Sequence, residues 1–590
     1  MEKRWSIYPH DAVRIQELER SAGVPAVLAR LLLCRGLDDP RLAREFLDPK
    51  LSGLRDPDQL PGVSPAARHI FAAVQASRPI TVFGDYDADG MVGTALLYRC
   101  LKLMGATVDY YIPNRLDEGY GLNDEALRIL SKQGTQVVIS VDCGIASLQE
   151  AQTARDLGLE LIITDHHEMR RTLPQAAAIV HPQLPGHDYP FAGLCGAAVA
   201  FKLAWALCQL SSGSQKVAAR YREFLLSSVG LVALATVADV VPLLDENRIL
   251  VKHGLGSLKE RPNPGMAQLL RVTELDRKPF LQSEDLAFTL APRLNAAGRL
   301  GQAGLGVELL VTDSDQRASV LAKHIHELNI KRDSLERSVY LAANKQATEQ
   351  FDPEHDPALV LAGHGWHAGV IGIVAGRLAE KYHRPVVLIS LDELGVRPGV
   401  GSGRSAGVLN LNEAFAHCGV HLVSHGGHAA AAGLRVTEKN LAAFRTDFCE
   451  YGTDHIAVED RVACVQIDAE TSLAALTLNT VNQIERLSPF GQGNLRPTLS
   501  TTNVTLEGPP RKMGGGDRHF SAKIKQYELV LRAVAFGKGE WVDDLTQLDA
   551  PIDIAYRPVI NVFRGRRSVE LQLVDWRPSR VAAPVSNTVG

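Results

Sequence analysis

The sequence is short of the features that mark secreted and membrane-spanning proteins. Only eight of its 590 residues are cysteines, and no two of them form a C-x-x-C pair. Neither a disulfide framework nor a zinc ribbon is therefore expected. No apolar run reaches the roughly 18 residues of a membrane helix, and the first residues lack the apolar core of a signal peptide. We expect a cytoplasmic protein that makes no contact with a membrane.

The net charge of the chain is small, and no low-complexity tract is found. Lys and Arg number 63 against 67 Asp and Glu, a formal charge of -4, so nucleic-acid binding would need local basic patches. No internal repeat is found. Hydrophobic residues make up 45% and charged residues 22%, which is typical of a folded globular protein. A chain of this length is too long for one hydrophobic core, so we expect three or four folding units.

Residues 78–182 alternate short β-branched runs with helical stretches, the pattern of βαβ units and a parallel sheet. The expected strands are ITVF, QVVISV, LELIIT and AAIVHP, and the expected helices include MVGTALLYRCLKLMG and ASLQEAQTARDLG. Gly105 and Gly158 fall where helix C-caps belong. Residues 196–261 should be mostly helical, with the apolar stretch FLLSSVGLVALATVADVVPL buried.

The second half of the chain predicts three further parts. Residues 318–349 carry spaced apolar positions on a charged background and should form a long connecting helix. A second α/β pattern begins at ALVLAG and runs to about residue 455, and residues 460–577 alternate short strands with turns. We therefore expect an α/β fold, with two α/β domains joined by a long helix and a C-terminal OB-like β-barrel.

Acidic and imidazole side chains follow three successive strands of the first α/β pattern. Three aspartates, Asp85, Asp87 and Asp89, come directly after the first strand, Asp142 ends the second, and a third group ends the next one, namely Asp165, His166 and His167. Because ligands of an open parallel sheet bind at the carboxyl ends of its strands, these groups should meet at one edge. Carboxylates held this close would repel one another and take up protons unless a cation lay among them.

Carboxylates combined with imidazole suit Mn²⁺ or Mg²⁺, whereas thiolates would have indicated zinc. Two such ions can bind the attacking and the leaving oxygen of a phosphoryl displacement, with water as the nucleophile and one aspartate bridging them. A lone strand-end Asp is more often a helix N-cap or turn residue. To explain this sequence, however, capping or turn formation would have to be assumed separately for each of the acidic groups, which weakens that alternative. Cys143, beside Asp142, lacks an activating base and is not expected to be a nucleophile.

Nine stretches, in order along the chain, resemble the motifs of one family. They are DYDADG, SVDCG, TDHH, VADVVPL, APRLNAAGRL, GWHAGVIGIVAGRL, SGRS, SHGGHAAAAGL and SPFGQGNLRP. Over about residues 50–577 the chain resembles the bacterial RecJ family of single-stranded-DNA-specific exonucleases, in the DHH phosphoesterase superfamily. An ordered series of nine is far more specific than one short motif.

The resemblance implies two metal sites that share Asp142. The first would be held by Asp87 and Asp142, and the second by Asp89, Asp142, His166 and Asp239. The wider superfamily often has a histidine where this chain has Phe83, which leaves Asp85 or water to fill that place.

Two further groups would act beside these metals. The resemblance implies that His167 faces the scissile phosphate as a stabilising donor, and Asp165 should orient the histidine pair from behind.

Candidates for phosphate contacts lie outside the acidic cluster. Guanidinium groups match phosphate oxygens, which favours the arginines among them. The candidate side chains are Arg115, Asn295, Arg299, Ser402, Arg404 and His428. A surface ion pair is the plain alternative for Arg115 and Arg299. In SGRS and GGHAAAAG, glycines could let backbone N–H groups approach an anion, and we expect the second of these stretches to lead into a small-residue helix.

The C-terminal region supplies the local positive charge that the whole chain lacks. Residues 496–580 hold 14 Lys and Arg against 10 Asp and Glu, a difference of +4. Four aromatic residues are available for base stacking, about half of which we expect in the core: Phe520, Tyr527, Tyr556 and Phe563. A basic barrel with exposed aromatics binds single strands without reading sequence.

With the resemblance, the expected domains are an N-terminal helical extension at 1–50, a DHH catalytic domain at 51–317, a helical connector at 318–352, a DHHA1 substrate-binding domain at 353–457, an OB-like single-strand-binding domain at 458–577 and a flexible tail at 578–590. The expected partner is single-stranded DNA. A single-strand-binding protein and a RecQ-type helicase are further candidates, and we expect a monomer.

The expected activity is hydrolysis of single-stranded DNA from the 5′ end with two Mn²⁺ or Mg²⁺ ions, releasing 5′-mononucleotides in repair and recombination. One rival is a phosphodiesterase of the DHH superfamily that acts on short oligonucleotides, cyclic dinucleotides or pyrophosphate, although such substrates need no capture barrel. Another is a non-catalytic replication scaffold, against which the intact set of acidic and imidazole residues argues.

Overall fold

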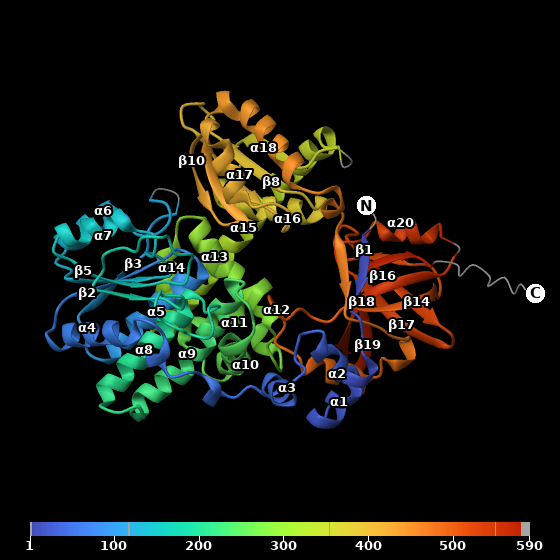
Figure 1. The fold of residues 1–590 in the computed structure, drawn as a ribbon, viewed down its shortest axis with the longest axis horizontal. Coiled ribbons are helices and arrows are strands. Elements are labelled where there is room, and N and C mark those ends of the chain that lie inside the picture. Colours follow the sequence, from blue (N-terminus) through green and yellow to red (C-terminus); the bar gives the residue numbers. More distant parts are fainter. Residues whose placement is uncertain (1–2, 116–117, 353–354, 549, 580–590) are drawn as a thin grey trace, which may run out of the picture. The chain divides into compact units, whose positions relative to one another are not determined.

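The computed structural model describes residues 3–115, 118–352, 355–548 and 550–579, which form two compact units (Figure 1). The first, here the two-sheet unit, comprises Leu51–Val462 together with Gly491–Gly493. The second, here the barrel unit, comprises Met1–Lys50, Ala463–Phe490 and Asn494–Gly590. Most of the expected tail lies outside the described residues.

The first sheet of the two-sheet unit is fully parallel, in the order β3-β2-β4-β5-β6. Its strands are β2 (Ile80–Gly84), β3 (Val108–Tyr111), β4 (Val137–Val141), β5 (Glu160–Thr164) and β6 (Ala178–Val180). The predicted parallel sheet is confirmed. The sequence reading missed β3, an edge strand that needs no continuous apolar run and carries Asp109 in its centre.

Helices cover both faces of this sheet (Figure 1). On one face lie α4 (Val63–Gln75), α5 (Ala88–Leu103) and α8 (Gly196–Ser212), and on the other α6 (Asp124–Lys132) and α7 (Leu148–Asp156). The helices α5 and α7 are followed by Gly105 and Gly158 at φ +84° and +71°, so the C-cap prediction is confirmed.

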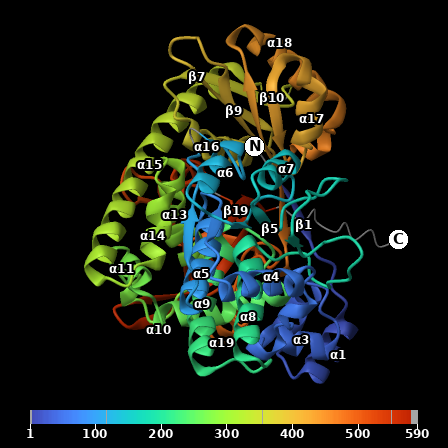
Figure 2. The ribbon, with the colours of Figure 1, turned by 90° about the vertical axis from the view of Figure 1, so that its left-hand side faces the viewer.

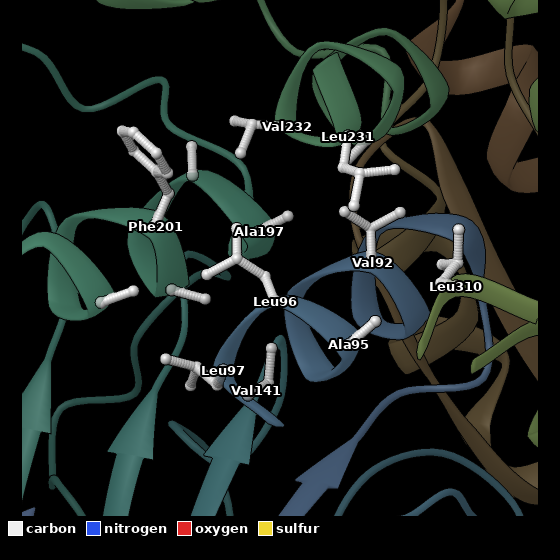
Figure 3. Close-up of a cluster of buried hydrophobic side chains, with 14 of the residues drawn as sticks. Val92, Ala95, Leu96, Leu97, Val141, Ala197, Phe201, Leu231, Val232 and Leu310 are labelled. Atoms are coloured by element: carbon white, nitrogen blue, oxygen red, sulfur yellow. The ribbon is translucent and has the colours of Figure 1, made fainter. Parts of the chain in front are cut away.

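The core between α5, α8 and α9 (Ala219–Ala238) consists mainly of small and aliphatic side chains, together with Phe201 (Figure 3). Leu96 and Leu97 are almost fully buried, which stabilises the fold by about 1.5–3 kcal/mol for each side chain. Gly93 lets α5 approach closely, because a Cβ there would lie 2.6 Å from Cγ1 of Val141. This packing fixes α5 and α8 over the carboxyl end of β4.

Helix α9 is the one described helix that is long and apolar enough to cross a membrane by length and composition. No unbroken apolar run of membrane length is present in the sequence, because Ser227, Ser228 and Thr236 interrupt this stretch. Of the most apolar window, 61% is buried inside the structure, as is common for a core helix. The predicted burial of this stretch is confirmed.

The other elements of the two-sheet unit that precede its second sheet are helical. They are η1 (Leu51–Gly53), η2 (Pro57–Gln59), α10 (Asp245–Glu260), α11 (Pro264–Val272), η3 (Leu275–Arg277), α12 (Ser283–Asp285), the π-helix η4 (Leu286–Leu290), α13 (Ala291–Arg299), α14 (Ala303–Val311) and α15 (Asp315–Gln350). Helix α15 has 36 residues, about 54 Å at the standard rise. It packs beside α13 and α14 (Figure 2). Leu321 and Val339 are buried in two different cores.

The second sheet has the order β10-β11-β9-β8-β7, in which only β7 and β8 are parallel. Its strands are β7 (Leu359–His364), β8 (Val386–Leu391), β9 (Gly399–Arg404), β10 (Leu422–Gly427) and β11 (Ala431–Val436). The accompanying helices are α16 (Ala368–Tyr382), α17 (Leu411–His417), η5 (Cys418–His421), η6 (Glu438–Asn440), α18 (Leu441–His455) and η7 (Val458–Arg461).

Two expectations for this second sheet are wrong. The stretch after Gly427 does not lead into a helix, because residues 428–430 turn β10 back into β11. The glycines of SGRS do not form an anion-binding turn either. They lie in β9, a central strand paired with β8 and β11 on both sides, whose backbone amides are committed to the ladder. Ser402 and Arg404 can therefore contribute only their side chains.

The barrel unit closes a ring of five strands, in which β14, β18, β19, β17 and β16 pair in turn and β16 pairs back with β14. This confirms the predicted barrel. The strands of the unit are β1 (Arg4–Ile7), β12 (Cys464–Ile467), β13 (Ala469–Glu470), β14 (Leu499–Leu506), β15 (Arg511–Met513), β16 (His519–Gln526), β17 (Leu529–Ala535), β18 (Ile552–Phe563) and β19 (Arg566–Pro578).

The barrel unit also holds helices from both ends of the chain. They are α1 (Ala12–Ala22), α2 (Ala26–Leu33), α3 (Pro40–Leu47), η8 (Leu473–Ala475), α19 (Leu478–Glu485) and α20 (Trp541–Thr546). Of the four aromatic candidates, Phe520 and Tyr556 are fully buried, whereas Tyr527 and Phe563 are 84% and 67% exposed. Half of them therefore remain available for stacking, as expected.

Candidate metal centre

The loop after β2 carries three aspartates into the first turn of α5. Asp87 is the N-cap of α5, and its Oδ1 accepts hydrogen bonds from the amides of Asp89 and Gly90 at 2.9 and 3.0 Å. One carboxylate oxygen thus serves as the cap, while the other is left for a ligand. Gly90 is required at its position, since a Cβ there would lie 2.6 Å from the carbonyl oxygen of Asp85.

Asp89 is 1% exposed and lies against the N-terminus of α8. Its Oδ2 and Oδ1 accept hydrogen bonds from the amides of Gly196 and Ala197 at 2.7 and 2.8 Å. A helix N-terminus favours a negative charge. Burial and the neighbouring charge of Asp87 nevertheless raise the pKa of Asp89 to about 6.

Asp142 follows β4 in a left-handed conformation with φ +62° and is 2% exposed. Its pKa is raised well above the usual range, first by burial and then by the charges of Asp89 and Asp87. Gly196 must be a glycine for α8 to begin here, because a Cβ would lie 2.6 Å from Oδ1 of Asp142.

Asp165 holds the histidine pair that follows β5. Its Oδ1 accepts hydrogen bonds from the amides of His166 and His167 at 2.8 and 3.1 Å and pairs with Nδ1 of His167 at 2.8 Å. Its Oδ2 accepts from the amide of Ile145 at 2.9 Å. Burial acts to raise the pKa of Asp165, but the hydrogen bond to His167 and its charge outweigh burial and lower it to about 2.

The two histidines differ in charge. Burial lowers the pKa of His167, but the hydrogen bond and charge of Asp165 raise it to about 9, so His167 is cationic near neutral pH. Burial, followed by the charge of His167, lowers the pKa of His166 to about 3. His166 is therefore a neutral imidazole, the form that binds metals.

The neutral His166 lies among three carboxylates. Its Nε2 is 3.1 Å from Oδ1 of Asp142, 3.6 Å from Oδ2 of Asp239 and 3.9 Å from Oδ2 of Asp89. Asp239 is the C-cap of α9, and burial followed by the charge of Asp89 raises its pKa to about 9. These groups come from four separate segments of the chain.

The potential ligand atoms meet in three overlapping groups, each with its atoms within 4.8 Å of one another. The groups are Asp85, Asp87 and Asp142; Asp89, His166 and Asp239; and Asp142, His166 and His167. Four of these residues carry a buried polar atom with no hydrogen-bond partner among the described residues, namely Oδ1 of Asp85, Oδ1 of Asp142, Nε2 of His166 and Oδ2 of Asp239. Buried atoms of this kind cost free energy unless something binds them. Oxygen-rich ligation with one imidazole fits Mn²⁺ or Mg²⁺.

Phe83 contributes nothing to this cluster. It is fully buried on the face of the sheet that α6 and α7 cover, and its ring stacks on that of Tyr111 with 5.2 Å between the ring centres. Asp85, and not Phe83, lies beside Asp87 and Asp142. The pKa of Asp85 is raised first by burial and then by the charge of Asp87. Of the two alternatives for this place, the geometry favours Asp85.

Three of the predicted phosphate-binding side chains lie close to one another. Burial, followed by the charges of Arg115 and Arg404, lowers the pKa of Arg299 to about 10. Arg404 donates to Oγ of Ser402 at 3.0 Å, and the guanidinium of Arg115 lies 4.9 Å from the ring centre of Tyr86. Among the described residues, none of the three arginines forms an ion pair with a carboxylate. The surface ion-pair alternative therefore has no support, and the group is suited to an anion.

Two other predicted phosphate contacts, His428 and Asn295, lie beside different parts of the acidic and histidine cluster. The ring of His428, in the turn after β10, lies 6.1 Å from the ring of His167, and its Nδ1 is 3.4 Å from Oε2 of Glu168. Asn295 accepts a hydrogen bond from the amide of Ala88 at 2.8 Å. Asn295 therefore supports the loop that carries Asp85 and Asp87.

Sequence reasoning missed two side chains of the centre. The hydroxyl of Tyr120 donates to the carbonyl oxygen of Asp142 at 3.1 Å and lies 3.3 Å from Nδ1 of His167. Nε2 of His181 bonds to the carbonyl oxygen of His167 at 2.8 Å. Tyr120 lies five residues after Arg115 in the stretch IPNRLDEGYGL, so its nearness to a candidate phosphate contact was the available signal. Cys143 is fully buried with a raised pKa, which agrees with a structural role.

Three family models match the chain. The DHH family, N-terminal domain, matches residues 79–234, the DHHA1 domain matches residues 355–452, and the RecJ OB domain matches residues 467–575. All residues of the acidic and histidine cluster except Asp239 lie in the first match, and Ser402, Arg404 and His428 lie in the second.

Relatives match almost the whole chain. Single-stranded-DNA-specific exonuclease RecJ of Bacillus subtilis (strain 168) is 35% identical over 97% of this chain and 70% of the relative. The protein of the same name from Escherichia coli (strain K12) is 33% identical over 95% and 98%. Among solved structures, RecJ in complex with Mn²⁺ from Thermus thermophilus matches with a TM-score of 0.82 and 31% identity, covering 98% of this chain and 80% of that one.

Proposed function

The chain belongs to the RecJ family, and we propose on that premise that it is a single-stranded-DNA-specific exonuclease that releases 5′-mononucleotides in the 5′→3′ direction during repair and recombination. One observation carries the chemistry. Four buried ligand atoms that lack a hydrogen-bond partner among the described residues meet at one sheet edge, and three arginines that likewise have no carboxylate partner there lie close to one another in the same unit. A cation pair and a phosphodiester would satisfy both sets of groups.

The cofactors are two Mn²⁺ or Mg²⁺ ions. Structures of RecJ from Thermus thermophilus contain Mn²⁺ or Mg²⁺, and the donor set here suits either ion. One ion would be held by Asp87 and Asp142 with Asp85, and the other by Asp89, Asp142, His166 and Asp239. When bound, such a pair polarises the phosphate and activates water for hydrolysis.

The remaining residues of the centre position the substrate and stabilise charge. His167, held cationic by Asp165, would donate to the scissile phosphate as negative charge develops on it. Tyr120 restrains His167 through its hydroxyl group. Asp165 touches no reacting atom in this assignment and acts as a positioning residue.

The substrate strand would be held at its phosphates. Arg115, Arg299 and Arg404 supply guanidinium groups, with Ser402 supporting Arg404. His428 would approach the phosphate beside His167. The strand would thread between the two sheets of the two-sheet unit, and a channel too narrow for a duplex would make strand selectivity steric.

We further propose that the chain is organised as the motifs predict. The divisions are a helical extension at 1–50, the catalytic domain at 51–317, the connector at 318–352, the substrate-binding domain at 353–457, the single-strand-binding barrel at 458–577 and a tail at 578–590. Exposed Tyr527 and Phe563 support single-strand capture by the barrel. We also propose a cytoplasmic monomer that cooperates with a single-strand-binding protein and a RecQ-type helicase.

Digestion of an end-labelled single strand, with and without Mn²⁺, tests the function. We expect metal-dependent release of mononucleotides from the 5′ end and little digestion of a blunt duplex. Faster turnover of dinucleotides than of a long strand would favour a small-substrate phosphodiesterase. Binding of DNA without any hydrolysis in Mn²⁺ would favour the scaffold alternative, and equal digestion of duplex would refute steric selectivity.

A further inference from the structure

The motif SPFGQGNLRP contains a short segment, Gly491–Gly493, that has no place in the proposed metal or phosphate contacts. The chain on both sides of it, Ala463–Phe490 and Asn494–Gly590, belongs to the barrel unit. These three residues belong to the two-sheet unit instead. They lie against residues 240–244, the loop that follows Asp239 and leads from α9 to α10.

The contact between the segment and this loop requires glycine. The carbonyl oxygen of Gln492 accepts a hydrogen bond from the amide of Leu243 at 2.8 Å. A Cβ on Gly491 would lie 2.6 Å from Cδ1 of Leu243. Gly493 has φ +71°, and a Cβ on it would lie 3.2 Å from Cβ of Pro242. The segment therefore contacts the loop through its backbone, and glycine at positions 491 and 493 permits this close approach.

The loop needs such outside support. Val240 directly follows Asp239, has φ +60° and is 64% exposed, and a β-branched residue rarely holds this conformation by itself. On its other side the loop is held by Asn247, whose buried amide donates to the carbonyl oxygens of Pro242 and Gly193. Gly193 lies just before α8, whose first amides bind Asp89. The loop is thus fastened at Asn247 and at Gln492.

The ends of the segment are fastened within the barrel unit. Asn494 is 1% exposed, and its Nδ2 donates to the carbonyl oxygens of Leu487 and Pro489 at 2.9 and 2.8 Å. Its Oδ1 accepts from Nε of Arg35 at 2.8 Å. The chain that enters and leaves Gly491–Gly493 is therefore closed into a loop by one side chain.

We propose that Gly491–Gly493 is a positioning segment for Asp239 and thereby sets the affinity of the Asp89–His166–Asp239 site for its divalent cation. The inference rests on the proposed metal role of Asp239. A shift of the segment would release the amide of Leu243 and let the loop after Asp239 relax, which would move a ligand carboxylate without touching the metal.

The variant Gly491→Ala tests the segment in the full-length, metal-free chain. We expect Mn²⁺ titration calorimetry to show binding about 10- to 100-fold weaker at one of two sites, the usual effect of losing an outer-shell support. Amide hydrogen exchange at Leu243 should be faster even without metal. The control Gly515→Ala has no atom within 4 Å of the added Cβ and should leave both readings unchanged. Adding Leu243→Val to Gly491→Ala should restore the affinity by making room.

The variant Asn494→Ala tests whether the anchored ends of the segment matter for its position. Asn494 touches no metal ligand, yet its loss should weaken Mn²⁺ binding at the same site. Asn561→Ala is the matched control, because the side chain of Asn561 bonds to Glu570 on the barrel strands. A merely structural role of Asn494 would lower the melting temperature of the barrel unit and leave the Mn²⁺ affinity at the wild-type value.

The outcomes separate this inference from the proposed function. Wild-type Mn²⁺ affinity and Leu243 exchange in Gly491→Ala would overturn the positioning role. Weak binding in Gly491→Ala with wild-type affinity in Asn494→Ala would overturn the role of Asn494 in holding the segment. Failure of the wild-type protein itself to bind Mn²⁺ or digest a single strand would instead refute the proposed function.

Discussion

Nε2 of His166 lies 3.1 Å from Oδ1 of Asp142, and in the described part of the chain neither atom has a hydrogen-bond partner with suitable geometry. Both atoms are buried, so water does not satisfy them. Since the imidazole is neutral, an ion pair with Asp142 is not formed near neutral pH. A cation between the two groups accounts for their placement and for the other unsatisfied carboxylate oxygens around them.

The variant Asp142→Ala should lose most nuclease activity and keep its fold. One carboxylate serves both proposed ions, so its loss weakens both at once. Removing one of several buried, mutually repelling carboxylates should also raise the melting temperature of the metal-free protein. Digestion of a labelled single strand and circular dichroism check these effects. Near-normal hydrolysis after metal depletion and Mn²⁺ resupply would contradict the assignment.

The variant Asp165→Asn should change the pH dependence of hydrolysis. The hydrogen bond and charge of Asp165 raise the pKa of His167 to about 9, so the wild type keeps a cationic His167 up to that pH. In the variant the imidazole should lose its proton near pH 6.5, and kcat at pH 8 should fall about 10- to 100-fold. Asp156→Asn, which alters an exposed carboxylate, is the control. An unchanged pH profile would exclude the positioning role of Asp165.

The variant Arg404→Lys should raise the KM for single-stranded DNA more than it lowers kcat. A charged hydrogen bond contributes about 1.5–3 kcal/mol, so a loss of about 10-fold or more in affinity is expected, because lysine lacks the planar fork. Arg377→Lys on α16 is a suitable control, since Arg377 pairs with Glu336 instead. Equal KM values in the two variants would remove Arg404 from the substrate site.

The stability of the metal-free protein should fall as the pH rises from about 6.5 to 9. Burial and neighbouring carboxylates raise the pKa of Asp239 to about 9, whereas the unfolded value is near 3.9. The folded state therefore binds more protons in this range, and its stability is lost as the pH rises through the folded pKa. His167, raised to about 9, acts in the same direction, and His166 has finished titrating in the folded state far below pH 6.5.

Chemical denaturation of the metal-free chain at pH 6.5, 7.5 and 8.5 measures this slope. Asp239→Asn should make it shallower, because the raised carboxyl is gone. Saturating Mn²⁺ should abolish or reverse the slope, since deprotonated ligands bind the metal more tightly. A stability that rises with pH in the metal-free wild type would contradict the arrangement of buried carboxylates.

Sequence patterns predicted the parallel sheet and the acidic cluster because both depend on local rules. Strand periodicity locates β2, β4 and β5, and the rule for strand ends brings Asp87, Asp142 and His166 together. The edge strand β3 was not predicted from the sequence, because a short stretch with one polar face is also compatible with a loop. The hairpin after Gly427 was mistaken for a helix because a run of alanines has high helix propensity, which strand pairing with β11 overrides.

Other features depend on contacts between distant segments. The amides of α8 that bind Asp89 lie more than 100 residues away, and no local pattern indicates that contact. The same holds for Asn295 and the amide of Ala88, and for Gln492 and the amide of Leu243. The sequence indicates which groups do the chemistry, whereas their supports become visible only in the folded chain.

Anomalous diffraction from crystals of the full chain grown with Mn²⁺ tests the central claim most directly. The account predicts two manganese peaks at the carboxyl edge of the first sheet, both contacting Asp142, one with Asp87 and the other with Asp89, His166 and Asp239. Peaks elsewhere, or none at this edge in crystals that hold manganese at other sites, would contradict it.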